Sequence, residues 1–125
     1  MINMSVVDVK LLLLNTLNTI YKDYPVYLQG SMSDTDVYPT SFFTYWNNQT
    51  ADAAFYDNQE TETIWDFDLN FYSVDPLLVN TVLLTVKSEL KKKGFIIDGS
   101  GYDVLSDEAT HTGRGINPIY IQKLK

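Results

Sequence analysis

The stretch from Thr61 to Ile97, TETIWDFDLNFYSVDPLLVNTVLLTVKSELKKKGFII, decides the fold. In its first part, Trp65, Phe67, Leu69 and Phe71 alternate with residues that are mostly acidic or polar. A period of two is typical of a strand with one apolar face and one polar face. The spacing then becomes helical and returns to a short apolar run, so the stretch predicts a strand, a helix and a second strand.

The helix of this unit has clear limits in the sequence. Asp75 is a suitable N-cap, and the proline that follows it suits the first helical turn, so we expect a helix over Pro76 to Lys93 that Gly94 ends. Phe95 to Ile97 should begin a new strand. The apolar stripe of the helix should cover the apolar face of the long strand; it consists of Leu78, Val82, Val86 and Leu90.

The chain before this unit predicts one more helix and two strands. Ser5 or Asp8 can cap a helix that runs to about Tyr24, where Pro25 follows and ends it. The remaining segments are a short strand at Val26 to Leu28, a polar loop at Gly30 to Thr40, a strand at Ser41 to Gln49 and a linking segment at Thr50 to Glu60. The strand at Ser41 to Gln49 has apolar residues on both faces, so it should be covered on both sides or lie against a neighbouring subunit.

The chain after the unit is rich in loops. We expect a short strand at Tyr102 to Leu105 and a last strand at Ile116 to Leu124, where Pro118 favours an edge position or a bulge. The predicted fold is α+β, in the order α-β-β-β-α-β-β, with a mixed, mostly antiparallel sheet and both helices on one face. The strand that starts at Thr61 would be ~44 Å long, so either a bulge bends it or a long β-hairpin projects beyond the core.

Length and composition limit the classes of function. The 125 residues predict a single domain over 1–125, and the absence of cysteine excludes disulfides and thiol catalysis. No apolar run is long enough for a membrane span, so we expect no membrane association. The net charge of −7 and the lack of Lys and Arg from Asp23 to Val86 argue against a nucleic-acid surface. Lys91 to Lys93 instead suit the C-terminal end of a helix.

Candidate catalytic and metal-binding groups are weak. His111 is the only histidine, and Asp107 and Glu108 alone do not complete a usual zinc site. Asp66 and Asp68, with Glu89 and Lys91 on the helix, make a metal-dependent nuclease the best enzyme hypothesis. However, these carboxylates should lie on the sheet face opposite the helix. We therefore expect no enzyme activity, no metal and no cofactor.

Four stretches together resemble the small tail-terminator, or tail-completion, proteins of long-tailed bacteriophages, which are head-to-tail joining components of the virion neck. With the first helix, the likeness covers nearly the whole chain in element order and spacing. The stretches are YPTSFFTYW at 38–46, WDFDLNFYS at 65–73, LKKKGF at 90–95 and DEATHTGR at 107–114.

The resemblance implies a structural virion protein, assembled in the cytoplasm of the host bacterium. It would form a homo-oligomeric ring, expected to be a hexamer, that caps the tail tube and ends its polymerisation. The implied partners are the major tail tube protein and the head-tail connector or stopper protein. DNA would pass through the acidic bore without specific binding. The alternatives are another neck component, such as a head-completion or connector subunit, the nuclease above, or a general binding domain.

Loops and the hairpin should carry the contacts between subunits. For Arg114, pairing with an acid of a neighbouring subunit and pairing within the chain are both open. The candidate interface residues are Tyr38, Phe42, Trp46, Phe55, Tyr56, Asp57, Asp107, Glu108, His111 and Arg114.

Overall fold

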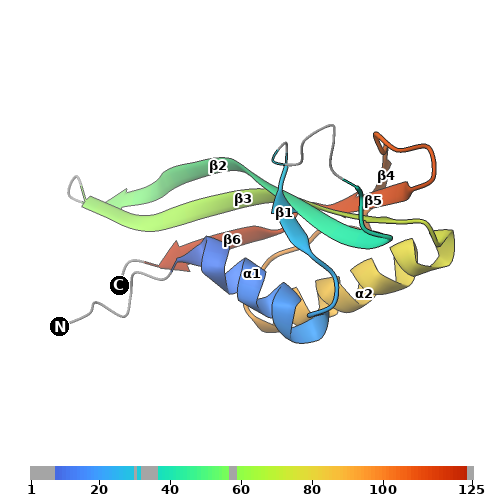
Figure 1. Cartoon of the computed structure of the whole chain (residues 1–125). Helices are drawn as coiled ribbons and strands as arrows, with labels where there is room; N and C mark the ends of the chain where they lie inside the picture. The colour runs from blue at the N-terminus through green and yellow to red at the C-terminus, as the bar shows by residue number, and fades with distance from the viewer. Residues whose placement is uncertain (1–7, 30, 32–36, 57–58, 124–125) are drawn as a thin grey trace.

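A computed structural model describes residues 8–29, 31, 37–56 and 59–123, with side chains given outside residues 52–61. Two helices and six strands follow one another along the chain (Figure 1). In chain order they are α1 Val9–Ile20, β1 Val26–Leu28, β2 Ser41–Tyr56, β3 Gln59–Ser73, α2 Pro76–Lys92, β4 Tyr102–Val104, β5 Thr112–Ile116 and β6 Ile119–Lys123.

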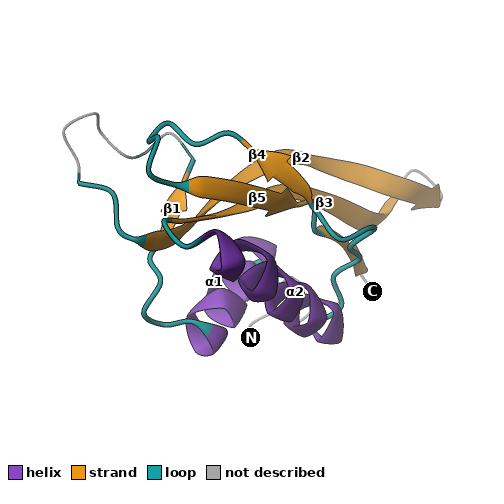
Figure 2. Ribbon diagram, turned by 90° about the vertical axis from the view of Figure 1, so that its right-hand side faces the viewer, coloured by secondary structure: helices purple, strands orange, loops and turns teal. Residues whose placement is uncertain are grey.

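The strands form one mixed sheet in the order β1-β2-β3-β5-β4, and β6 pairs with β3 beyond β5. Only the pairing of β1 with β2 is parallel. Both helices lie under the same face of this sheet, so the molecule has two layers (Figure 2). The predicted class is confirmed, with one strand more than expected.

The core lies between the helices and the inner face of the sheet, which is the face toward the helices. The alternation that predicted the long strand is correct, since Phe67, Leu69 and Phe71 are fully buried there. The other core residues are Val9, Leu13 and Leu17 of α1, Val79, Val82, Leu83, Val86 and Leu90 of α2, Phe43 and Ile116 of the sheet, and Phe95 and Ile97.

Helix α1 begins as predicted and ends early. Asp8 is the N-cap, and its carboxylate accepts a hydrogen bond of 3.2 Å from the amide of Leu11. The predicted end near Tyr24 is wrong, because the helix stops at Ile20 and the backbone dihedral angles of Tyr21 are no longer helical. The ring of Tyr21 stacks on Tyr24 at 5.2 Å, so packing of these rings replaces the last expected turn.

Helix α2 has the predicted limits within one residue. The Asp75 carboxylate accepts a 3.0 Å hydrogen bond from the amide of Leu77, and Gly94 follows the helix with a φ of 103°. The strand expected at Phe95 to Ile97 does not form. Only Ile96 bridges to Ile119, while Phe95 and Ile97 are buried in the core. The apolar run is explained by packing rather than by strand pairing.

The hairpin of β2 and β3 is longer than predicted. The expected link at 50–60 is strand on both sides, since β2 continues to Tyr56 and β3 starts at Gln59. Both mechanisms considered for the length are present. A bulge between Asn47 and Gln49 shifts the register of β2, and the hairpin also extends beyond the ends of the helices (Figure 1).

The predicted last strand begins three residues later than expected, as β6 at Ile119, and β5 at Thr112–Ile116 forms where mainly a loop was predicted. Asn117 and Pro118 separate the two strands. Asn117 Nδ2 donates to the backbone oxygen of Phe67 at 2.7 Å and to Asp66 Oδ1 at 2.6 Å. The amide of Phe67 then donates to the backbone oxygen of Pro118 at 3.0 Å. Proline cannot donate to a ladder, so the side chain of Asn117 bridges the gap and lets β5 and β6 follow one another along the same edge of β3.

Candidate functional site

The outer face of the sheet, which is the face away from the helices, carries polar side chains together with several aromatic rings. Strand pairing fixes which residues share it, because directly opposed residues of antiparallel strands point to the same side. Its members on the four main strands are Phe42, Thr44 and Trp46 of β2, Asp66, Asp68, Asn70 and Tyr72 of β3, Gly113 and Gly115 of β5, and Tyr102 and Val104 of β4.

One end of the outer face is closed by an aromatic cluster, defined as Tyr27, Tyr38, Phe42, Tyr72 and His111. Phe42 is its centre and is 2% exposed. The ring centroids of the other four lie 5.9, 5.5, 5.2 and 5.8 Å from that of Phe42, in the order given. The two-sided apolar pattern of β2 therefore has an explanation within the chain, because loops cover the outer face here.

His111 fixes one of these loops by hydrogen bonds rather than by binding a metal. Its Nε2 lies 2.7 Å from the backbone oxygen of Pro39, and a carbonyl can only accept, so Nε2 carries the proton and donates. Nδ1 then accepts from the hydroxyl of Thr110 at 3.0 Å. Both ring nitrogens are occupied, so His111 joins the loop before β5 to the loop before β2.

Two glycines of β5 make room for the rings of the outer face. A Cβ at Gly113 would lie 2.6 Å from Cε1 of Tyr72 and 2.8 Å from a methyl group of Val104. A Cβ at Gly115 would lie 2.3 Å from Oδ1 of Asn70 and 3.0 Å from Tyr102. Contacts this close do not occur between real side chains, so both positions require glycine for space rather than for backbone flexibility.

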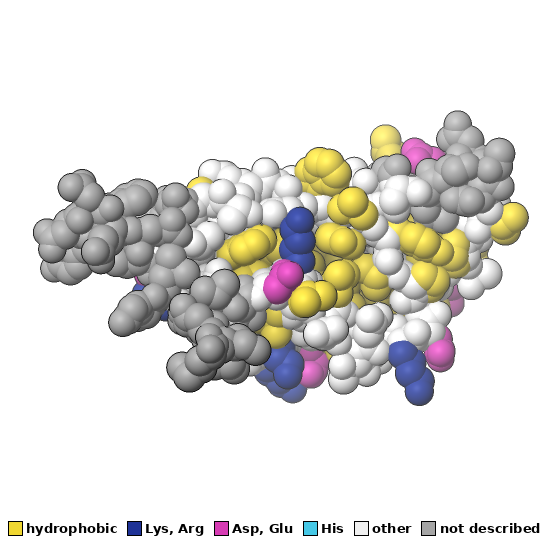
Figure 3. Space-filling view, turned by 60° about the vertical axis from the view of Figure 1, so that its left-hand side comes forward, with side chains coloured by type: hydrophobic (Ala, Val, Ile, Leu, Met, Phe, Trp, Pro, Cys, Tyr) yellow, Lys and Arg dark blue, Asp and Glu magenta, His cyan; other side chains and the backbone are white. Residues whose placement is uncertain are grey.

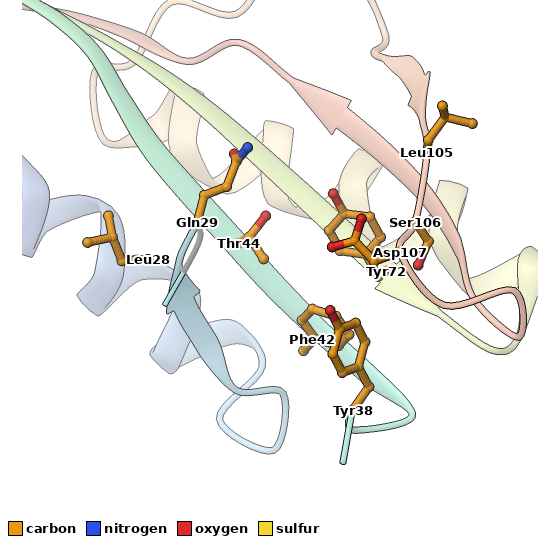
Figure 4. A pocket seen from close by; sticks show the side chains of 9 residues that line it. All are labelled: Leu28, Gln29, Tyr38, Phe42, Thr44, Tyr72, Leu105, Ser106 and Asp107. Carbon is orange, nitrogen blue, oxygen red and sulfur yellow. The ribbon is translucent and has the colours of Figure 1, made fainter. Parts of the chain in front are cut away.

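A cavity of about 200 Å³ opens on the outer face beside the aromatic cluster (Figure 4). Phe42, Thr44 and Tyr72 form its floor. Its walls come from the end of β1, from Tyr38 and from the segment after β4. The wall residues are Leu28, Gln29, Tyr38, Leu105, Ser106 and Asp107.

The polar groups of this cavity affect one another. Burial raises the pKa of the Tyr72 hydroxyl, and the Asp107 carboxylate raises that pKa further, while polar contacts with Thr44 and Asn70 oppose the rise. Thr44 Oγ1 approaches the Tyr72 hydroxyl without a hydrogen bond of normal geometry, so it is buried without a partner among the described residues. The floor of the cavity thus holds an oxygen with unused hydrogen-bonding capacity.

On the rest of the outer face Asn70 is buried, but two large side chains are exposed. Trp46 is 46% exposed and Tyr102 is 44% exposed. Burial raises the pKa of Tyr102, and the carboxylates of Asp68 and Asp66 raise it further.

Among the described residues no group of three or more His, Cys, Asp or Glu side chains could hold a metal ion.

The nuclease constellation does not come together. Asp66 and Asp68 lie on the outer face, whereas α2, with Glu89, lies under the inner face. Glu89 pairs with Lys92 at 3.0 Å, and Asp66 accepts from Asn117. The sheet therefore separates the two halves of the suggested catalytic set, as the alternation predicted.

The outer edge of β2 is free over most of its length. Strand β1 pairs only with Phe43 to Tyr45. From Trp46 to Tyr56, no strand of the described chain lies on the side of β2 away from β3. Figure 3 shows a face of the molecule on which hydrophobic side chains gather across the middle, with basic and acidic side chains among them and below them.

The structure divides the ten predicted interface residues into groups. Phe42 and His111 are buried within the chain, where both pack in the aromatic cluster, so in this structure neither side chain offers surface to a partner. Trp46, Asp107 and Glu108 are exposed and Tyr38 is half-buried. Phe55 and Tyr56 belong to β2 with side chains that are not described, and Asp57 lies outside the described residues.

Arg114 pairs within the chain. Its guanidinium donates to Asp103 at 2.8 Å and to the backbone oxygen of Gly101 at 3.2 Å. Pairing of this side chain with a neighbouring subunit is therefore not needed to explain it.

Sequence reasoning did not find the cavity at Thr44 or the free edge, because both depend on which strands pair.

Comparison of the chain with protein-family models and with curated proteins finds no match. Neither helix of the described chain combines the length and the apolar character needed to cross a membrane. The geometry thus defines a class, a small α+β protein with one covered and one open sheet face, and leaves its function to be proposed.

Proposed function

We propose that this protein is a structural subunit of a phage neck, a tail terminator that assembles into a ring, caps the tail tube and joins it to the head connector. The proposed identity rests on the resemblance of the four sequence stretches to tail-terminator proteins. The observation that carries the assembly is the free edge of β2. The proposal assigns the chain no catalysis, metal or cofactor.

The free edge favours pairing with another chain. Residues Trp46 to Tyr56 present backbone donors and acceptors along a strand without lysine, arginine or proline. Soluble proteins usually protect such edges with those residues, with bulges or by covering them, because an open edge adds a strand from another molecule. The described part of this edge has one such device, the bulge between Asn47 and Gln49, and is free beyond it. In a ring, each subunit uses one surface to bind a different surface of its neighbour, so every free edge can be covered.

The charge distribution supports a bore that passes DNA without holding it. The hairpin strands contain no basic residue, and the outer face adds Asp66 and Asp68. A wall of the same sign as the phosphates avoids the counterion release that drives DNA binding. A ring whose bore is lined with lysine and arginine would contradict this part of the proposal.

The assembly is tested by mass measurement in solution and by electron microscopy. We expect a species of about six subunit masses, rings in negative stain, and shorter tubes when the protein is added to polymerising tail tube protein. A protein that remains monomeric at high concentration and does not bind tube ends would refute the proposal. Binding to connectors but not to tubes would instead identify another neck component.

A pair of variants tests the role of the edge. Thr50→Lys places a charge at an exposed position on the free edge, and Thr85→Lys makes the same change at an exposed position of α2. We expect the first to shift the mass distribution toward monomer and the second to leave it unchanged. An equal effect of both would show that net charge, rather than the edge, controls assembly.

For the nuclease alternative, metal-dependent DNA cleavage that is lost in Asp66→Ala would be required.

A further inference from the structure

The cavity beside the aromatic cluster has the chemistry of a site for a positive charge. It is lined by three aromatic rings, from Tyr38, Phe42 and Tyr72, and by the carboxylate of Asp107. Among the described residues, no lysine, arginine or histidine lines it. Aromatic faces attract cations through the ring quadrupole, and a carboxylate adds a charge-assisted hydrogen bond.

A second observation points independently to a ligand. Thr44 is 9% exposed, and its buried Oγ1 makes no hydrogen bond of standard geometry with a described residue, its polar contact being with the Tyr72 hydroxyl of the same cavity. Buried polar groups in folded proteins nearly always have a partner, because an unmade hydrogen bond is costly. Figure 4 shows this oxygen turned toward the space between the Tyr72 hydroxyl and the Asp107 carboxylate.

The Asp107 carboxylate is also available. It is exposed at the rim, and none of the ion pairs between described residues includes it. It lines the same cavity as Thr44 and Tyr72, and Figure 4 shows its carboxylate beside the Tyr72 side chain. A donor that carries positive charge would satisfy Thr44 and Asp107 together, whereas an anion would be repelled by the Asp107 carboxylate, although the hydroxyl groups of the lining could donate to it.

We propose that this cavity binds the cationic end of a lysine or arginine side chain presented by a protein partner. The volume of about 200 Å³ admits an alkylammonium or alkylguanidinium group with part of its stem. The stem lies against Tyr38 and the exposed Leu28 and Leu105 of the walls, and the cation reaches Thr44 and Asp107. The inference rests on the cavity and holds whether or not the protein forms a ring.

Small probes test the chemistry directly. n-Butylammonium and butylguanidinium chlorides are titrated into the full chain, with neutral n-butanol as the matched probe, and binding is followed by two-dimensional amide NMR. We expect saturable shifts at Thr44, Tyr72 and Asp107 with a Kd of about 1–10 mM for the cations. The butanol should bind at least ~5-fold more weakly, since it lacks the charge.

Neighbouring acids provide the control. Asp107→Asn should weaken binding of the cationic probes about tenfold, and Thr44→Val about threefold, through loss of one acceptor each. Glu108→Gln removes the same charge one residue away from a side chain that does not line the cavity, and should change the Kd less than ~2-fold. Absence of saturable shifts, equal binding of butanol, or an equal effect of Glu108→Gln would overturn the proposal.

Discussion

Phe42→Ala tests whether the aromatic cluster is a second core or an exposed interface. The side chain is 2% exposed and lies within 5.2 to 5.9 Å of four other rings, measured between centroids. Truncation of a buried phenylalanine typically costs ~3–5 kcal/mol, which includes the cavity left behind. We expect a loss of ~3 kcal/mol in the free energy of unfolding, because the space left by the Phe42 ring lies near the surface and can partly collapse.

Trp46→Ala is the matched control for that variant. Trp46 is two residues further along the same face of β2 and is 46% exposed, so its truncation should cost only ~1 kcal/mol. Urea unfolding followed by circular dichroism, at protein concentrations low enough to keep the variants monomeric, gives both free energies. Equal losses for the two variants, or less than ~1 kcal/mol for Phe42→Ala, would refute the assignment of Phe42 to a core within the chain.

Three further changes follow from the contacts of β3 and β5. Burial raises the pKa of Tyr72 above its ordinary 10.0, so the stability that this phenol contributes is complete below pH 10 and is lost as the pH rises through the folded pKa. Ionisation of tyrosines is followed by absorbance at 295 nm in the wild type and in Tyr72→Phe, and the difference between the two curves is the titration of Tyr72. Its midpoint should lie above pH 10, and a midpoint at or below that pH would contradict the burial of the hydroxyl. Gly113→Ala should cost ~1–3 kcal/mol despite the better strand propensity of alanine, because its Cβ would be 2.6 Å from the Tyr72 ring; thermal unfolding checks this, and a stabilised variant would be inconsistent with it. Asn117→Ala should lower the free energy of unfolding by ~1–3 kcal/mol, because the backbone oxygen of Phe67 loses the hydrogen bond from the Asn117 side chain. Amide hydrogen exchange should become faster in β6 but not in β4.

Local signals predicted the helix α2 and the inner face of β3 because the required information is local. The Asp75 cap, Pro76 and Gly94 act within one turn of the helix, and strand alternation depends only on the chain itself. The same signals placed Asp66 and Asp68 opposite the helix, and the strand pairing agrees.

The missed features depend on contacts between distant residues. The alanine-rich end of β2 has low strand propensity and resembled a link, but pairing with β3 makes it a strand. Phe42 is buried because His111 holds the loop at Pro39 over it, a contact between residues 72 positions apart. The cavity at Thr44 requires both loops at once, so no short stretch of sequence could have indicated it.

Strand β3 has a particular position in the order of synthesis. It pairs with β2, which precedes it directly, and on its other edge with β5 and β6, which follow only after α2 and a long connection. While the chain is being made on the ribosome, this second edge has no strand to bind until Thr112 to Lys123 have emerged. Charged side chains such as those of Asp66 and Asp68 disfavour pairing of an uncovered strand with an identical chain. Asn117 later binds this edge through the backbone oxygen of Phe67.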